Sequence, residues 1–277
     1  MVLNQRKRWL TFLVTTPCIL LAVIYIFPVY WLVSISLAHT ADAFQFPPNI
    51  VFEPTLKHYQ SLFETRPVFR YYANTLIVVS GSVIVSVLLG IPAAFALSRF
   101  KLRGKKDLLI WILSLLVIPP AAAAIPYYLF IRQLGLLHTR LSLIIVYTTF
   151  NLPFIIWLAK SFFDALPREI EDAAFIDGCS RWGVLRHIAV PMTVHGIASS
   201  ALFCVIMTWN EFMFAIVLTG LDTYTLPVTV MSFWTDKHVY WGQIFALGTL
   251  LVVPIIVLGV IIQRFLVRGF TFGAVKG

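Results

Sequence analysis

Long apolar stretches with almost no charged residues constrain this chain more than any other feature of its sequence. The hydrocarbon core of a bilayer is about 30 Å thick, so a spanning helix needs about 20 mostly apolar residues. The stretches that reach or approach this length predict membrane-spanning helices at residues 14–38, 71–98, 108–131, 141–163, 194–219 and 241–265. These stretches do not alternate between polar and apolar residues. Because backbone groups in lipid must be satisfied internally, we expect helices and not a β-barrel.

Composition points to the same class of protein. Of the 277 residues, 60% are hydrophobic and only 12% are charged, whereas a soluble globular domain has about 25% charged residues. The net charge of +9 could indicate a nucleic-acid partner, but the basic residues lie at the ends of the apolar stretches. That placement is typical of a membrane surface. We therefore predict an all-α, polytopic membrane protein in which residues 1–277 form one transmembrane domain with six spanning helices.

The distribution of basic residues predicts the orientation. If both termini are cytoplasmic, fifteen of the 21 Lys and Arg residues fall inside. These are Arg6, Lys7, Arg8, Arg99, Lys101, Arg103, Lys105, Lys106, Lys160, Arg168, Arg181, Arg186, Arg264, Arg268 and Lys276. Lys57, Arg66, Arg70, Arg132, Arg140 and Lys237 fall outside. Cytoplasmic loops carry the excess of Lys and Arg, so both ends are expected in the cytoplasm.

No pattern of catalytic or metal-binding residues is present in the sequence. The three cysteines form no CxxC pair, and the six histidines have no HExxH spacing. The phosphate-binding pattern GxxxxGK[ST] is absent as well. We predict a chain that is not an enzyme and has no metal or cofactor of its own.

The inner loop at residues 164–191 has its own helical signals. Pro167 suits a first helical turn, and acidic residues follow it where they favour the helix dipole. Gly178 suits the position after a helix end, because it tolerates positive φ. Ser180 can cap a second helix that runs to about Val190, where Pro191 limits it. From the residue types alone, this pair of short helices is either a docking element for a partner or a solvated amphipathic connector.

The same loop resembles a known family. Permease subunits of bacterial ABC importers carry a cytoplasmic loop with EAA, three residues, Gly, nine residues, Ile, one residue and Leu-Pro. This chain has Asp172-Ala173-Ala174, then Gly178, Ile188 and Val190-Pro191 at the same spacing. Asp replaces Glu and Val replaces Leu. Ser98-Arg99-Phe100 and Trp209-Asn210-Glu211-Phe212 also resemble the carbohydrate branch of the family, the maltose importer type.

The resemblance implies a six-span permease of the type I importer fold with a cytoplasmic coupling helix. It implies a second homologous permease subunit, two ATPase subunits that bind ATP and Mg, and an extracytoplasmic binding protein. The expected location is a bacterial or archaeal plasma (inner) membrane. The residues expected to couple to the ATPase are Glu171, Asp172, Ala173, Ala174, Asp177, Gly178, Ile188 and Pro191. A bulky or charged side chain at Ala174 or Gly178 is expected to uncouple transport.

Three polar residues within the apolar stretches are candidates for the substrate path. Asn151, Asn210 and Glu211 are costly at membrane depth and usually face protein or water. Each of them could line the path, or could instead make a hydrogen bond between helices.

Several function classes stay open at this point. An ABC importer for glycerol phosphate or a polyamine fits the same loop as a sugar importer. A secondary transporter would need ion-coupling charges within the membrane, and Glu211 is almost the only candidate. A membrane-embedded enzyme would need paired His, Asp or Glu residues on facing helices. A purely structural scaffold does not explain the spacing of the inner loop.

Overall fold

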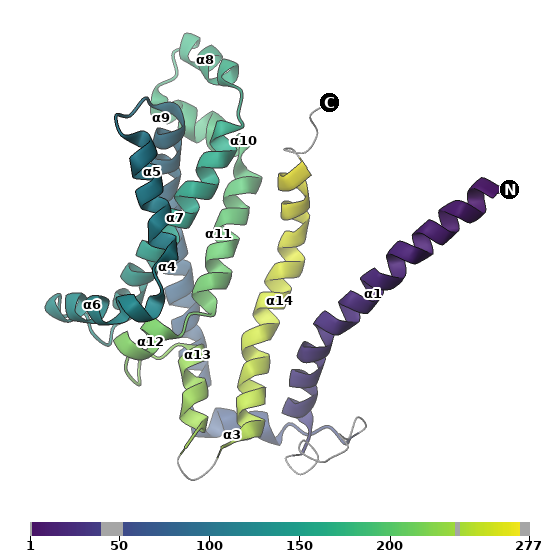
Figure 1. Cartoon of the computed structure of the whole chain (residues 1–277). Coiled ribbons are helices and arrows are strands. Elements are labelled where there is room, and N and C mark those ends of the chain that lie inside the picture. The colour runs from purple at the N-terminus through teal and green to yellow at the C-terminus, as the bar shows by residue number, and fades with distance from the viewer. Residues whose placement is uncertain (1, 40–51, 236–238, 272–277) are drawn as a thin grey trace. The chain divides into compact units, whose positions relative to one another are not determined.

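A computed structural model describes residues 2–39, 52–235 and 239–271, and Figure 1 shows the chain. Side chains are described for residues 13–39, 52–235 and 239–260. Two basic residues used for the orientation, Lys237 and Lys276, lie outside the described residues. The described chain is helical throughout, apart from turns and one isolated bridge between Trp234 and Val239. The all-α prediction is confirmed.

The helices follow one another with short connections. In chain order they are α1 (Val2–Leu37), α3 (Lys57–Thr65), α4 (Val68–Arg99), α5 (Lys105–Ser114), η1 (Leu115–Val117), α6 (Pro120–Gln133), α7 (Arg140–Asp164), α8 (Arg168–Ile176), α9 (Arg181–Val184), the π-helical turn η2 (Leu185–Ala189), α10 (Val190–Met192), α11 (Val194–Trp209), α12 (Met213–Leu218), α13 (Leu226–Thr229), η3 (Val230–Phe233) and α14 (Trp241–Thr271).

Four of these helices are long and apolar enough to cross a bilayer as continuous spans. They comprise Leu13–Leu37 of α1, α4, α7 and Trp241–Val260 of α14. Two further segments pass the same test only as bent pairs, Lys105–Val117 with Pro120–Gln133 and Arg181–Met192 with Val194–Trp209. The described residues therefore hold six spans if each bent pair counts as one.

The predicted span at 108–131 is interrupted at its prolines. α5 and η1 meet α6 at an angle of 98°. Ile118 and Pro119 have extended backbone conformations, with ψ of 118° and 134°. Proline has no N–H to continue the helix and disfavours helical conformation in the residue before it. The consecutive Pro119 and Pro120 therefore end one helix and begin the next.

The chain comprises two compact units, and the smaller one contains residues 1–67 and 230–254. Within it, α3 is attached to the end of α1. The hydroxyls of Ser36 and Tyr59 are 2.8 Å apart, and Nε2 of His58 lies 2.9 Å from the carbonyl oxygen of Ala38. Gln243, near the start of α14, donates to Ser61 of α3 at 3.2 Å.

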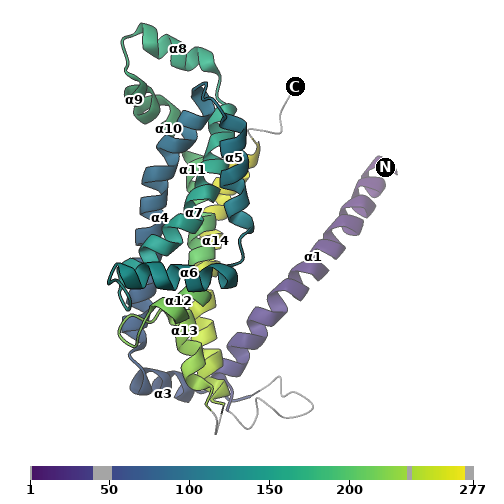
Figure 2. The same cartoon turned by 60° about the vertical axis from the view of Figure 1, so that its left-hand side comes forward.

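The larger unit contains residues 68–229 and 255–277, and its core lies between α4, α7 and α11. Phe95, Ile155, Phe163 and Cys204 from these helices are buried in one cluster. Figures 1 and 2 show α4, α7 and α11 running side by side, with α8 beyond one end of them and α6 and α12 near the other. The loop at residues 164–191 thus lies at one end of this helical bundle.

Candidate functional site in the loop between α7 and α11

Local sequence explains where α8 begins and ends. Pro167 precedes it with an extended backbone, and Glu169 and Glu171 lie in the first turn, where negative charge favours the helix dipole. At the other end the amide of Cys179 donates to the carbonyl of Ala174 at 2.9 Å, and the amide of Gly178 donates to that of Phe175 at 3.1 Å. This pair of bonds is the Schellman pattern of a helix C-terminus. Gly178 has the positive φ, +85°, that the pattern requires.

The second helical segment begins where Ser180 caps it. The amide of Gly183 donates to the Ser180 hydroxyl at 3.1 Å. The helix expected from Arg181 to about Val190 extends two residues further, because helical structure continues through η2 and α10 to Met192. The π-helical turn explains this, since the amide of Val190 reaches the carbonyl of Leu185, one residue further back than in an α-helix. That wider turn accommodates the proline ring, and α11 then departs at an angle of 79°.

α8 has one buried face and one exposed face. Glu171 and Ala174 are buried, three residues apart. Ala174 belongs to the hydrophobic cluster around Phe95 and Phe163, and Ile188 packs against the same cluster.

The residues on the other side of α8 and after it are open to the surroundings. Asp172, Ala173, Asp177, Gly178 and Pro191 are exposed, and so are three large apolar side chains that sequence reasoning missed: Ile170, Phe175 and Ile176. Ile176 is 87% exposed. Ile170 and Ile176 are six residues apart, which places them on different sides of a helix, so no periodic pattern in the sequence marks them.

Glu171 faces into the protein and pairs with the end of α4. Its Oε1 atom accepts a hydrogen bond from Nε of Arg99 at 2.7 Å and lies 2.6 Å from Nη2 in the ion pair. Both side chains are almost enclosed, 10% exposed for Arg99 and 6% for Glu171. Arg99 also donates to the hydroxyl of Ser98 at 3.1 Å and to the carbonyl of Leu166 at 3.2 Å. The Ser98 hydroxyl in turn donates to Asp164, at the end of α7, at 2.6 Å.

A pocket of about 270 Å³ lies between α8 and the end of α4. It is lined by Phe95, Arg99, Phe100, Arg168, Glu171, Asp172, Phe175 and Arg181. The guanidinium of Arg181 lies over the ring of Phe100, 4.6 Å from its centre. Asp172 also lines this pocket but has no ion pair among the described residues. Its carboxylate can therefore accept from a cationic partner.

Of the three candidates for the substrate path, Asn151 lies in α7, and Asn210 and Glu211 follow the end of α11. The structure gives each of them a hydrogen bond. Asn151 is buried, and its amide donates to the Thr208 hydroxyl at 2.9 Å. Asn210 is exposed and donates to the carbonyl of Ile206 at 2.8 Å. The Glu211 carboxylate accepts from the Tyr147 hydroxyl at 2.5 Å. Hydrogen bonds within and between helices thus account for all three.

Glu211 also marks a break that the sequence prediction did not include. The span expected at 194–219 is divided into α11 and α12, with residues 210–212 between them. The amides of Phe214 and Ala215 donate to the Glu211 carboxylate at 2.9 and 3.3 Å. A carboxylate that caps α12 in this way competes with continuation of α11, which explains the break.

The sequence matches a known family model over residues 86–272, which include every described helix from α5 to α14 and thus the whole inner loop. That model describes the inner membrane component of binding-protein-dependent transport systems. The chain belongs to this family. The permease is therefore a multi-pass membrane transport subunit, and the family is one of transport components, not of enzymes.

Individual relatives cover nearly the whole permease. It is 38% identical over 256 residues to a probable ABC transporter permease of Sinorhizobium fredii, covering 92% of both chains. It is 30% identical over 263 residues to the trehalose/maltose transport system permease protein MalG of Thermococcus litoralis, covering 94% of both. A bacterial ABC transporter that imports the acidic polysaccharide alginate has a chain of the same fold, with a TM-score of 0.76, 22% identity and coverage of 94% of the permease and 97% of that chain.

Proposed function

We propose that the permease forms half of the translocation path of an ATP-driven sugar importer. The second half is a homologous permease subunit, and an extracytoplasmic binding protein delivers the sugar. The family description supports the binding protein. The trehalose/maltose relative, which matches along 94% of the permease, supports a carbohydrate substrate.

The exposed side of α8 carries the proposal that this helix docks on an ATPase. A short helix at the end of the bundle has its inner face fixed by Glu171 and Ala174, while Asp172, Ala173 and Ile176 are exposed. A helix that lays one face into a partner's groove is a recurring mode of recognition. The ATPase subunits bind ATP and Mg, and Asp172 accepts from a basic group on one of them.

Transport follows from this docking by alternating access. ATP closes the two ATPase subunits, and the closure displaces α8 together with the end of the bundle that holds it. Since α7 and α11 flank the loop in the chain, they tilt with it. Coupling of this kind requires two discrete arrangements whose populations the ATPase and the transport path both affect.

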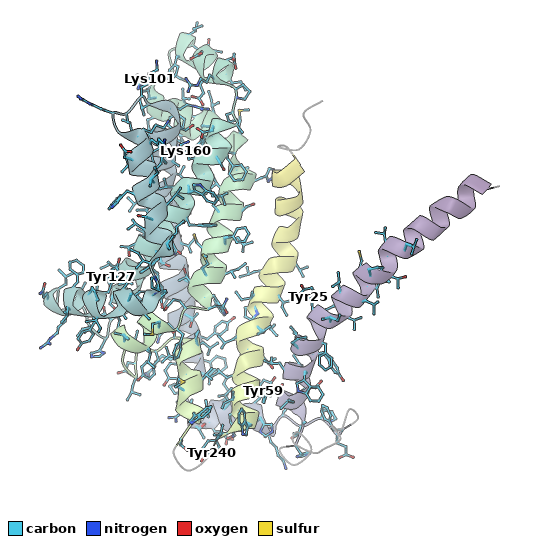
Figure 3. The ribbon with its side chains drawn as sticks, in the orientation of Figure 1. Tyr25, Tyr59, Lys101, Tyr127, Lys160 and Tyr240 are labelled. Carbon is cyan, nitrogen blue, oxygen red and sulfur yellow. The ribbon has the colours of Figure 1, made fainter. Side chains whose placement is uncertain are left out.

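The orientation proposed is α8 and both termini in the cytoplasm. Figure 3 shows Lys101 and Lys160 at the end of the larger unit where α8 lies, and Tyr127 near the opposite end. Such clustering of basic residues at one end fits the cytoplasmic side. Cys179, exposed in the loop, provides a direct test with a membrane-impermeant thiol reagent. It should react in inverted vesicles and stay unmodified in intact cells, and reaction in intact cells would overturn the orientation.

Docking is tested by copurification of the ATPase with a tagged permease. Asp172→Lys should lose the ATPase, because it replaces the free carboxylate with an ammonium group that repels the basic group of the ATPase. Asp107→Lys is the matched control, since Asp107 is exposed in the first turn of α5, outside the loop. If Asp172→Lys retains as much ATPase as the control, Asp172 does not contact the ATPase.

The solute is tested by uptake in cells with and without the permease. Trehalose and maltose are expected to enter only cells that contain the permease. If glycerol 3-phosphate or a polyamine enters in this way instead, the sugar assignment is wrong and the permease imports that other solute. A secondary transporter would continue uptake after deletion of the ATPase and stop when an ionophore removes the ion gradient. The importer is expected to show the opposite pattern.

A further inference from the structure

The inner loop is joined to α4 although the two are far apart in the chain. The covalent neighbours of α8 are α7 and the α9–α11 segment. Arg99, the last residue of α4, lies 72 positions before Glu171. Their buried ion pair therefore adds an attachment that chain connectivity alone does not provide.

The contacts of Arg99 reach three elements at once. From the end of α4, its guanidinium bonds Glu171 on α8 and the carbonyl of Leu166, just before α8. Through the Ser98 hydroxyl it connects to Asp164 at the end of α7. Planar guanidinium donors fix direction as well as distance, so this network determines the angle of α8 relative to α4 and α7.

A second contact joins the same two regions. The Arg181 guanidinium, at the first residue of α9, lies over the Phe100 ring, the residue directly after α4. The loop is thus attached to the end of α4 at both of its short helices. A buried pair of opposite charges is costly to separate, because separation leaves an enclosed charge without a partner. α8 and α4 are therefore expected to move as one body.

The α4 helix can pass that motion along the bundle. Gly90 of α4 allows close approach to Ile155 of α7, and Gly81 does the same for Ile144. The Ser86 hydroxyl oxygen on α4 lies 3.5 Å from the carbonyl oxygen of Thr148 on α7. A displacement of α4 thus meets α7 along several turns of both helices.

We infer that Arg99 and Glu171 are a positioning pair that transmits the movement of α8 to α4, a span that the loop does not adjoin in sequence. The transmission to the transport cycle rests on the proposed function, whereas the attachment of α8 to α4 does not. Glu171 acts in this role from inside the protein, and the contact with the ATPase belongs to the exposed side of α8.

The attachment is tested in the permease alone, by the distance distribution between spin labels at positions 89 and 176. Leu89 on α4 is 55% exposed and Ile176 on α8 is 87% exposed, so both sites tolerate a label. The background lacks Cys18, Cys179 and Cys204. We expect a narrow distribution for the parent protein and at least a twofold wider one for Arg99→Glu and for Glu171→Arg. The double exchange R99E/E171R restores the charge pair and should narrow the distribution again.

The matched control is the exposed pair Arg70–Asp222, whose side chains are 53% and 86% exposed. Arg70→Glu should leave the width unchanged, because water solvates both charges. The attachment is refuted if either single exchange at Arg99 or Glu171 keeps the parent width, or if the double exchange stays as wide as the single ones.

Transmission is tested in the purified complex with an ATPase variant that binds ATP without hydrolysing it. Labels at the exposed Leu76 of α4 and Met207 of α11 report the opposite end of these helices. ATP with Mg should shift this distance in the parent complex, fail to shift it in the single exchanges and shift it again in the double exchange. A full shift in the single exchanges overturns transmission through the pair. Absence of any copurified ATPase counts against the proposed function, and the label pair at 89 and 176 still decides the attachment.

Discussion

Ala173 and Ala174 are neighbours in α8 that face opposite environments. Ala174 is 7% exposed and packs in the cluster with Phe95 and Phe163, whereas Ala173 is exposed. The two alanines of the motif therefore meet different requirements. A small residue at Ala174 lets α8 pack closely on the bundle, whereas Ala173 lies on the side of α8 that we propose for docking.

Substitutions at these two positions are expected to fail in different ways. Ala174→Leu overfills a packed site and should lower the free energy of unfolding by about 1–3 kcal/mol, seen as a lower melting temperature in detergent. Ala173→Leu should leave the melting temperature unchanged and reduce copurification of the ATPase. An Ala173→Leu protein that binds ATPase normally would argue against a docking role for the exposed face.

A side chain at Gly178 should destabilise the protein because the backbone there has a positive φ, and not because neighbouring atoms crowd the position. A Cβ added there meets nothing within 4 Å, but φ is +85°. Gly178→Ala should therefore destabilise the end of α8 by about 1 kcal/mol, and Gly178→Asn by less, since Asn adopts this conformation more readily. Amide exchange of residues 168–176 should become about fivefold faster in the alanine variant.

Gly183 is the control for that measurement. It lies in α9, and a Cβ there would meet the Ser180 hydroxyl at an ordinary 3.4 Å. Gly183→Ala should leave the exchange rates of α8 unchanged. Equal rates for Gly178→Ala and Gly183→Ala would mean that the positive φ does not determine the stability of this helix end.

Glu211 is expected to stabilise the break between α11 and α12. Glu211→Ala removes the acceptor of the Phe214 and Ala215 amides and of the Tyr147 hydroxyl, so the free energy of unfolding should fall by at least about 1.5–3 kcal/mol. Tyr147→Phe leaves both amides bonded and should cost about 1 kcal/mol. Melting temperature and solute uptake are measured together. A Glu211→Gln protein with the parent melting temperature but no uptake would instead assign Glu211 to the substrate path.

Local rules account for most of the inner loop. Pro167, the acidic first turn, Gly178 and the Ser180 cap each act within a few residues, so the sequence alone predicts two short helices. The pairing of Arg99 with Glu171 could not be predicted in this way. It depends on how α4 and α8 pack in three dimensions, and neither residue differs locally from a solvated charge.

The membrane spans show the same difference between what local sequence predicts and what depends on three-dimensional packing. Apolar length predicts where helices lie, and the prolines at 119 and 120 signal a kink, but not a bend of 98°. Glu211 in an otherwise apolar run predicts either a residue of the substrate path or a partner in a helix–helix hydrogen bond. Its bonds to the amides of α12 show a third possibility, because an acidic residue within a span can cap a new helix.

Close approach of α4 and α7 depends on the absence of a side chain at Gly90. A Cβ there would lie 2.6 Å from Cγ2 of Ile155, which is fully buried. Gly90→Ala gains helix propensity of about 0.5–1 kcal/mol but forces the two helices apart, which typically costs about 1–3 kcal/mol. The melting temperature should therefore fall. Ile155→Ala removes the conflicting methyl group, so Gly90→Ala should be tolerated better in that background than in the parent. Gly259→Ala, where nothing lies within 4 Å, is the control and should not lower the melting temperature. If Gly90→Ala costs the same with Ile155 or Ala at position 155, the contact between these two residues does not limit the distance between α4 and α7.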